Sequence, residues 1–145
     1  MKLTVAEYKK LTSKQNKYGN IPTSRKVGDR VIKFQSQKEA THYDTLRLRL
    51  LANEISDLRL QPQFTLQESY ITAEGERIQA IRYTADFSYK SFGKKVATDS
   101  GIGYKLGTGG FVVEDVKGGN ATKTATYRMK KKLMQERLGI RITEV

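Results

Sequence analysis

The feature that most limits the fold of this 145-residue chain is an alternation of residue types between positions 81 and 89. Odd-numbered positions in this segment carry apolar or aromatic side chains, and even-numbered positions carry polar ones. Because successive side chains of a strand point to opposite faces, a period of two predicts a β-strand with one buried face. A second strand is predicted at 111–117, where an apolar run leads into charged residues and Gly118-Gly119 ends the segment.

Apolar residues at helical spacing predict two helices around these strands. Ser36 and Glu39 form a capping box at the start of the first, and Gly139 follows the end of the second. The resulting order is helix, three strands, helix, strand, which indicates an α/β (α+β) fold with a mixed central sheet flanked by helices. The predicted elements are a helix at about 37–52, strands at 55–66, 81–89 and 111–117, a helix at about 122–138, and a strand at 140–143.

Glycines are concentrated between residues 91 and 110, and a turn is predicted at 74–76. The spacing of these glycines matches neither the phosphate-binding loop of nucleotide hydrolases nor the dinucleotide-binding fingerprint, and no helix follows directly. We therefore predict that 91–110 is a loop or a hairpin inserted into the domain.

The charge is strongly positive, with 27 Lys and Arg residues against 15 Asp and Glu residues, a net charge of +12. Such a charge on a small domain predicts an acidic partner, and nucleic acid is the leading candidate because lysine and arginine neutralise its phosphates. A basic surface that serves only solubility is the alternative. No apolar run approaches the length of a membrane span, and the first residues lack the apolar core of a signal peptide, so cytoplasm is the simplest expected compartment.

This positive charge is concentrated near the start of the chain. Residues 1–33 contain nine basic and two acidic residues, a net charge of +7. A short helix is predicted at 3–15, followed by turn-forming residues at 16–28 that favour a mobile or docking segment. We expect a basic N-terminal arm at 1–30 and a globular domain at 31–145.

The rare residue types exclude several kinds of chemistry. The chain has no cysteine and a single histidine, His42, so thiol chemistry and multi-histidine metal centres within one chain are ruled out. We expect a packing or hydrogen-bonding role for His42 and for Gln61. Any metal site must consist mainly of oxygen ligands, which favours Mg²⁺ or Mn²⁺.

Four residues are candidates for such a site. Asp115 and Lys117 are two residues apart on a strand, so they share a face, while Glu114 points the other way. Asp86 lies on the preceding strand, and two carboxylates on neighbouring strands repel unless a cation or a proton lies between them. Glu39, in the first turn of a helix that packs on the sheet, can lean over the same place. Each has a simpler interpretation: a surface ion pair for Asp115 and Lys117, a solvated position for Asp86, and helix capping for Glu39.

These residues resemble a known signature. Asp86 followed by Asp115-x-Lys117 is similar to the PD-(D/E)XK motif of the restriction-endonuclease-like nucleases, without its proline, and the order of elements is similar to that superfamily's core. Over about residues 31–145 the chain resembles small phage-encoded proteins associated with Holliday-junction resolvases of the endonuclease I type. The strings that carry this resemblance are Phe34-x-Ser36-x-x-Glu39-Ala40, Gln61-Pro62-x-Phe64, Tyr83-x-Ala85-Asp86-Phe87, Val113-Glu114-Asp115-Val116-Lys117-Gly118 and Lys130-x-Lys132-Leu133.

The resemblance implies a function and a set of roles. It implies metal ligands at Glu39, Asp86 and Asp115, a further ligand in the carbonyl of Val116, and a catalytic lysine at Lys117. Glu114 could compete with Asp115 for the ligand role. The implied activity is Mg²⁺-dependent endonucleolytic hydrolysis of branched DNA by a homodimer, in the cytoplasm of the host cell if the protein is phage-encoded.

The basic residues would then hold DNA. We expect this role for Lys26, Arg30, Lys123, Arg128, Lys130, Lys131 and Lys132. A solvated helix face is the simpler interpretation of the cluster at 123–132. Two other functions remain open: a nuclease of the same superfamily that acts on ends, flaps or specific sequences, and a non-catalytic nucleic-acid-binding protein.

Overall fold

The structure is a computed structural model that describes residues 22–104, 109–119 and 123–145. The chain divides into two compact units, Met1–Ala40 and Thr41–Val145. The helix predicted at 3–15 lies outside the described residues.

The described part of the first unit is a β-hairpin. Strand β1 (Thr23–Val27) pairs antiparallel with β2 (Arg30–Phe34), and Val27 is opposite Arg30. The turn between them contains Gly28, whose φ of +60° suits glycine. No strand was expected within the mobile or docking segment predicted at 16–28, yet residues 23–27 form β1, because a two-residue turn between strand-forming residues favours a hairpin. The hairpin also spans the expected border between the arm at 1–30 and the domain at 31–145.

Helix α2 (Gln37–Leu51) begins as the capping box predicts. The Ser36 hydroxyl accepts a hydrogen bond from the backbone N–H of Glu39 at 3.1 Å. The Glu39 carboxylate accepts one from the backbone N–H of Gln35 at 3.3 Å. The helix ends before Asn53, whose φ is +55°.

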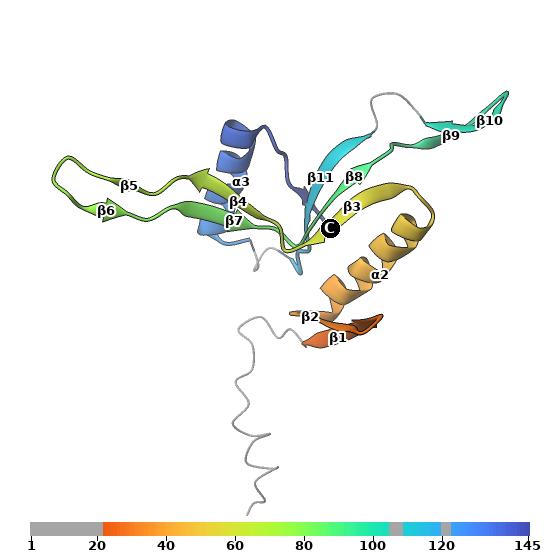
Figure 1. Ribbon diagram of the computed structural model, residues 1–145, viewed down its shortest axis with the longest axis horizontal. Helices are drawn as coiled ribbons and strands as arrows, with labels where there is room; N and C mark the ends of the chain where they lie inside the picture. Colours follow the sequence, from red (N-terminus) through yellow and green to blue (C-terminus); the bar gives the residue numbers. More distant parts are fainter. Residues whose placement is uncertain (1–21, 105–108, 120–122) are drawn as a thin grey trace, which may run out of the picture. The chain divides into compact units, whose positions relative to one another are not determined.

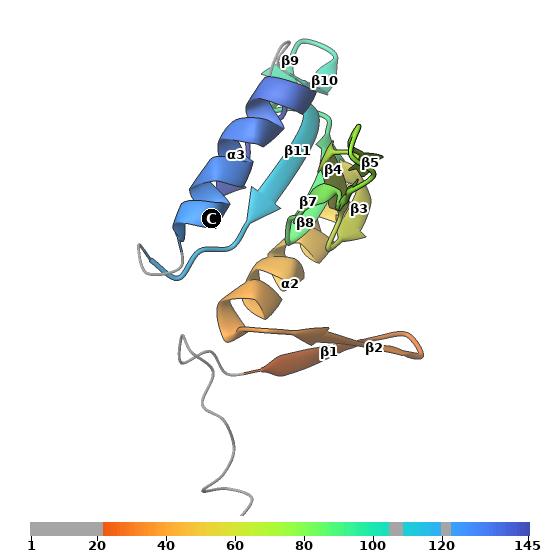
Figure 2. The same ribbon diagram turned by 90° about the vertical axis from the view of Figure 1, so that its left-hand side faces the viewer.

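The second unit is built on a four-stranded sheet in the order β12-β11-β8-β3 (Figures 1 and 2). β3, β8 and β11 are antiparallel neighbours, whereas β12 is parallel to β11. A parallel pair needs a crossover connection, and helix α3 provides it between β11 and β12. This is a mixed α+β fold with a mixed sheet, as the order of predicted elements indicates. The elements are β3 (Ile55–Leu60), β8 (Phe87–Ser91), β11 (Gly110–Asp115), α3 (Ala125–Leu138) and β12 (Thr143–Glu144).

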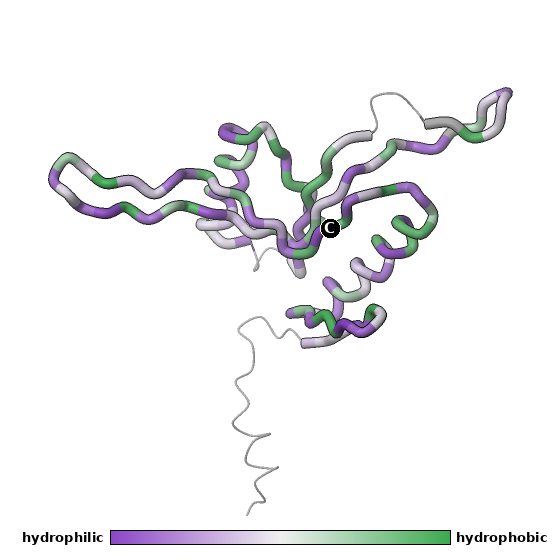
Figure 3. The backbone as a smooth tube through the Cα atoms, in the orientation of Figure 1, coloured by the Kyte–Doolittle hydropathy of each residue, from purple (hydrophilic) through white to green (hydrophobic). Residues whose placement is uncertain are grey.

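Two hairpin insertions connect the strands of the sheet. The first forms a ribbon between β3 and β8, along which hydrophilic and hydrophobic residues alternate (Figure 3). Its turn contains Gly75 at φ +86°, which agrees with the turn predicted at 74–76. The second insertion lies between β8 and β11, and it confirms the predicted hairpin within 91–110. The first consists of β4 (Gln63–Gln67), β5 (Tyr70–Ile71), β6 (Arg77–Ile78) and β7 (Ile81–Thr84), and the second of β9 (Lys95–Thr98) and β10 (Gly101–Tyr104).

The strand predicted at 81–89 is divided between two sheets. β7 pairs with β4, and β8 pairs with β3 and β11. The division occurs at Ala85 and Asp86: the N–H of Ala85 donates to the carbonyl of Pro62, whereas the N–H of Asp86 donates to that of Glu114. The neighbouring strand causes this break, because Gln61 has a φ of +48° and Pro62 has no N–H for a ladder.

The sheet carries a helix on each face. On one face the Tyr43 ring of α2 stacks on Phe87 of β8, with ring centroids 6.2 Å apart. On the other face α3 runs beside β11 (Figure 2) and contributes Tyr127 and Met134 to a core cluster that includes Val113. Leu138 is 43% exposed, because it is the last residue of the helix.

In the part of the chain that the structure describes, neither helix has the length and apolar composition that a membrane crossing requires.

Candidate functional site

The end of β11 and the start of β8 bring two of the predicted carboxylates together. Asp115 is the last residue of β11, and Asp86 directly precedes β8. Phe87 is opposite Glu114 in this antiparallel pair, and the N–H of Asp86 donates to the carbonyl of Glu114 at 3.2 Å. Asp86 was predicted on the strand beside 111–117; it lies directly before that strand, and its backbone is bonded to the end of β11.

Asp115 is buried between two partners. Its Oδ2 atom accepts a hydrogen bond from the Tyr83 hydroxyl and forms an ion pair with the Lys117 ammonium at 3.1 Å. The alternation of side chains thus places Asp115 and Lys117 on one side, as predicted. The simple interpretation as a surface ion pair is wrong, because the side chains of Lys117 and Asp115 are only 17% and 6% exposed.

The Asp86 carboxylate has a structural role as well as a negative charge. Its Oδ2 atom accepts a hydrogen bond from the backbone N–H of Val116 at 2.7 Å. Asp86 therefore holds the segment that carries Lys117 at the point where the strand ends.

The charges of Asp86 and Asp115 both affect the pKa of two tyrosines, Tyr83 and Tyr127. Burial, a hydrogen bond to Asp115 and the charges of Asp115 and Asp86 all raise the pKa of Tyr83 far above its ordinary value. The pKa of Tyr127 is raised by burial, by a hydrogen bond to Glu144 and by the charges of the same two aspartates. Both carboxylates thus act on the same hydroxyl groups, so the site concentrates negative charge within a positively charged protein.

Lys117 has a second neighbour that the sequence pattern did not reveal. Its ammonium lies 3.9 Å from the centroid of the Tyr127 ring, a cation–π contact. The backbone also holds this residue, because the N–H of Lys117 donates to the carbonyl of Val145 at 2.9 Å and the N–H of Val145 donates to Asp115 at 3.0 Å. Tyr127 also belongs to the core cluster, with 7% of its surface exposed. The available signal was its hydroxyl, since a buried tyrosine needs a polar partner.

Glu114 does not compete with Asp115 for the same site. It lies on the α2 side, where its Oε2 atom is 2.6 Å from Nε2 of His42 and its Oε1 accepts from the Tyr89 hydroxyl at 2.6 Å. Burial raises the pKa of Glu114, but the hydrogen bonds from His42 and Tyr89 outweigh it and hold the pKa below its usual range. The expected hydrogen-bonding role of His42 is confirmed.

The predicted DNA-binding residues fall into two groups. Lys26 and Arg30 are exposed on the hairpin of the first unit. In the second unit, Lys123 and Lys131 both form ion pairs with Glu144, at 2.7 and 2.6 Å. The other three lie on α3, where Arg128 and Lys132 are exposed and Lys130 is half-buried.

Glu39 belongs to the first unit, whereas Asp86 and Asp115 belong to the second. It is 6% exposed, and its backbone and carboxylate both take part in the start of α2. The capping interpretation of this residue is confirmed.

Two carboxylates at one place are a donor set that suits Mg²⁺, which proteins often bind through one or two carboxylates together with water and substrate phosphates. No cluster of three or more His, Asp or Glu side chains suited to a metal occurs within the described residues. Asp86 and Asp115 together supply carboxylate oxygens of the kind that Mg²⁺ prefers.

The fold and the site together define an α+β protein with three charged residues, Asp86, Asp115 and Lys117, where β8 begins and β11 ends. The chain belongs to the family described as "Protein of unknown function (DUF1064)", which matches residues 15–103. This match includes Glu39 and Asp86 and stops before Asp115. Comparison with curated proteins and with solved structures gave no match.

Proposed function

We propose that this chain is a metal-dependent endonuclease that hydrolyses phosphodiester bonds in DNA, with branched DNA such as four-way junctions as its substrate. The observation that carries the proposal is the buried Asp115–Lys117 pair beside Asp86, at the adjoining ends of β11 and β8. A lysine and two carboxylates at one point can bind a divalent cation and the phosphate that the cation activates.

The order of the elements supports the same proposal. In the second unit, three antiparallel strands, β3, β8 and β11, are followed by α3 and a strand, β12, parallel to the third. This is the order that the resemblance to restriction-endonuclease-like nucleases implies, with two hairpins inserted. In this chain Asp86 directly precedes the second of these antiparallel strands, Asp115 ends the third, and Lys117 follows it.

Each residue would contribute by charge and position. The Lys117 ammonium, held between Asp115 and the Tyr127 ring, would place positive charge where a phosphate oxygen becomes more negative during hydrolysis. Tyr83 orients the carboxylate of Asp115 through its hydroxyl. Asp86 keeps the backbone at Val116 in place and would add a second negative charge for a cation. A bound Mg²⁺ or Mn²⁺ would activate water for attack on phosphorus and neutralise the leaving oxygen.

Glu39 and the carbonyl of Val116 remain proposed additional ligands. Glu39 is buried, and Val116 follows Asp115 directly. A Glu39→Gln variant keeps the size of the side chain and its ability to accept a hydrogen bond from Gln35. A loss of Mn²⁺ affinity in that variant would support the ligand role, and an unchanged affinity would reject it.

The test of the main proposal is cleavage of synthetic DNA by the whole protein. Wild type is incubated with a four-way junction, a flap, a duplex and a single strand, in Mg²⁺, in Mn²⁺ and in EDTA. Asp86→Asn and Asp115→Asn should lose at least a hundredfold in rate, because each removes a charge without changing the shape of the side chain. Asp57→Asn is the matched control, since Asp57 is exposed on β3 and pairs with Arg59.

The outcomes distinguish the remaining functions. Preferential cutting of the junction supports a resolvase, whereas preferential cutting of flaps or ends supports another nuclease activity at the same site. If pure wild type cuts no form of DNA in either metal, the enzyme proposal is wrong.

A non-catalytic nucleic-acid-binding protein is the second candidate. It is favoured by the exposed basic residues of the hairpin and of α3, among them Lys26, Arg30 and Arg128. Calorimetric titration with Mn²⁺ separates the two: a nuclease should bind Mn²⁺ in a way that Asp86→Asn and Asp115→Asn abolish, and a simple binder should not.

The proposed homodimer follows from the substrate. A four-way junction needs two symmetric cuts, which a two-fold dimer can make. Sedimentation of the protein alone and with a junction measures this. A single protomer on each junction would contradict the dimer.

A further inference from the structure

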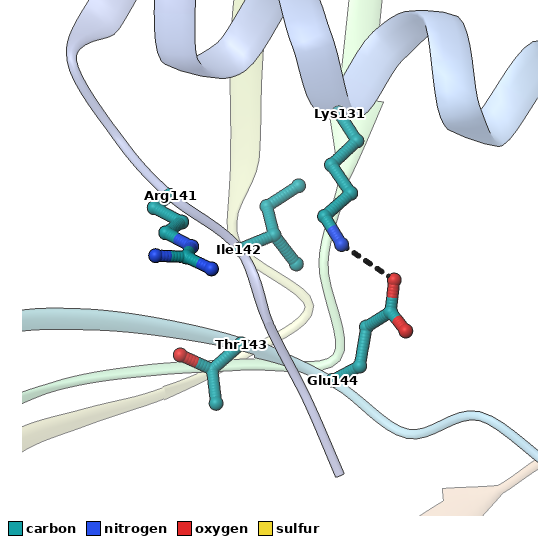
Figure 4. A pocket seen from close by; sticks show the side chains of 5 residues that line it. All are labelled: Lys131, Arg141, Ile142, Thr143 and Glu144. Atoms are coloured by element: carbon teal, nitrogen blue, oxygen red, sulfur yellow. Dashed lines mark hydrogen bonds and ion pairs between the residues drawn. The ribbon is translucent and has the colours of Figure 1, made fainter.

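The carboxylate of Glu144 lies at the centre of a cluster of positive charge. Its Oε2 atom is 2.7 Å from the Lys123 ammonium, and its Oε1 atom is 2.6 Å from the Lys131 ammonium (Figure 4 shows the second contact). The Tyr127 hydroxyl donates a third hydrogen bond to Oε1 at 3.0 Å. Each oxygen therefore has its own lysine, one just before α3 and one within it.

This cluster lines a pocket that is open to solvent. The pocket has a volume of about 520 Å³, and Arg128 and Lys132 lie in its wall beside the two lysines. Glu144 is the single acidic residue among those that line it. The side chains of Lys123 and Lys131 are 29% and 37% exposed, so an anion from solution can reach both.

We propose that Lys123, Lys131 and the Tyr127 hydroxyl form a binding site for one phosphodiester group of a nucleic-acid backbone, and that the Glu144 carboxylate occupies this site as an internal substitute. The nature of the ligand rests on the proposed function. Nucleic acid must displace Glu144, so the glutamate weakens binding of any DNA that cannot fill the site.

The chemistry of the two anions supports this exchange. A phosphodiester carries one negative charge and two non-bridging oxygens, and a carboxylate likewise carries one charge shared by two oxygens. Each can give one oxygen to each lysine, as Glu144 does. The pKa of Glu144 is lowered to about 2, chiefly by its hydrogen bonds to Lys123 and Lys131, so the carboxylate stays charged near neutral pH and competes with phosphate.

The site is connected to the candidate active site through Tyr127. The hydroxyl of this tyrosine contacts Glu144, and its ring contacts the Lys117 ammonium. A phosphate that replaces Glu144 would thus bind to the same side chain that positions Lys117. The backbone adds a second connection, because Glu144 is opposite Asp115 in the parallel β11–β12 pair.

The test is the affinity of Glu144→Gln for DNA in EDTA, where no cleavage can occur. Gln keeps the size of the side chain but removes the competing charge. We expect affinity for a mixed-sequence duplex to rise about tenfold, and the dependence of log K on log salt to steepen by about one phosphate contact. Glu136→Gln is the matched control: it changes the net charge equally, but Glu136 is 70% exposed and contacts Arg137.

Two further arms identify the ligand and the residues. Inorganic phosphate, titrated as a competitor, should displace DNA from Glu144→Gln at lower concentration than from Glu136→Gln if the site recognises phosphate itself. Adding Lys131→Met to Glu144→Gln should abolish the gain. In wild type, Lys131→Met should weaken DNA binding more than Lys90→Met, which removes an exposed lysine of β8. This comparison stands even if Glu144→Gln does not fold.

Equal DNA affinities of folded Glu144→Gln and Glu136→Gln would overturn the inference, and so would a gain that survives Lys131→Met. These results do not depend on hydrolysis. If wild type cuts DNA but Glu144→Gln does not bind DNA more tightly, only the phosphodiester site is refuted. If Glu144→Gln binds DNA more tightly but wild type cuts no DNA, only the nuclease proposal is refuted.

Discussion

The ammonium of Lys117 lies 3.9 Å from the centroid of the Tyr127 ring, although one follows β11 and the other belongs to α3. On its other side the same lysine is 3.1 Å from Asp115. A long, flexible side chain is thus held by a ring and a carboxylate from two different elements. This arrangement limits where the positive charge can go, which a site for phosphate chemistry requires.

We predict that Tyr127 positions Lys117 mainly through its ring. Tyr127→Phe keeps the ring and loses the hydrogen bond to Glu144, so DNA cleavage should fall by less than about tenfold. Tyr127→Leu removes the ring and should reduce cleavage by about a hundredfold, with a loss of about 1–2 kcal/mol in the free energy of unfolding. Cleavage assays and urea unfolding measure the two quantities. Equal rates for the Phe and Leu variants would show that the cation–π contact has no role in positioning Lys117.

A second prediction concerns the buried pair of His42 and Glu114. His42→Ala leaves the Glu114 carboxylate buried with one partner fewer, so the free energy of unfolding should fall by about 2 kcal/mol. The double variant His42→Ala with Glu114→Gln should recover part of this loss, because a neutral amide is cheaper to bury than a charge. Urea unfolding of the four proteins in this cycle measures the coupling. Strictly additive losses would contradict it.

The third prediction is that Glu114 makes the free energy of unfolding fall in acid. Its pKa is lower in the folded protein than the ordinary value of 4.5, so the folded state binds a proton less readily than the unfolded state. Glu114 therefore stabilises the fold above about pH 4.5, and this contribution is lost as the pH falls through the folded pKa. The free energy of unfolding, measured between pH 7 and pH 3, should fall more steeply for wild type than for Glu114→Gln. Parallel curves would refute this source of acid sensitivity.

A fourth prediction concerns Gly109, which precedes β11. A Cβ atom there would lie 2.8 Å from the carbonyl oxygen of Ser91. Ser91 cannot easily move, since it pairs with both Ile55 and Gly110 in the sheet. Gly109→Ala should therefore destabilise the protein by about 1–3 kcal/mol, as overpacking does.

The control for this prediction is Gly75→Ala. Gly75 has a φ of +86° with open space around it, so alanine there costs only backbone strain, about 1 kcal/mol. Thermal unfolding ranks the two variants. A smaller effect at Gly109 than at Gly75 would show that the approach to Ser91 can relax.

Local patterns predicted much of the fold. Helix α2 begins at its capping box because Ser36 and Glu39 are close in sequence: the Ser36 hydroxyl accepts from the N–H of Glu39, and the Glu39 carboxylate accepts from the N–H of Gln35. The extent of the strand at 81–89 is harder to predict, because the segments that pair with it determine where it breaks. The turn at Gln61 and Pro62 in a neighbouring segment divides it into β7 and β8, and the alternation within 81–89 contains no sign of this.

The candidate site shows the same division. The sequence by itself determined that Asp115 and Lys117 share a side and that Glu114 lies on the opposite one, because the period of a strand is a property of its own backbone. Only the tertiary structure decided which residues meet them. Asp86 accepts a hydrogen bond from Val116, 30 positions away, and the Tyr127 ring contacts the Lys117 ammonium. Glu144 forms ion pairs with Lys123 and Lys131. Those contacts depend on strand register and on the placement of α3, which packing between distant segments determines.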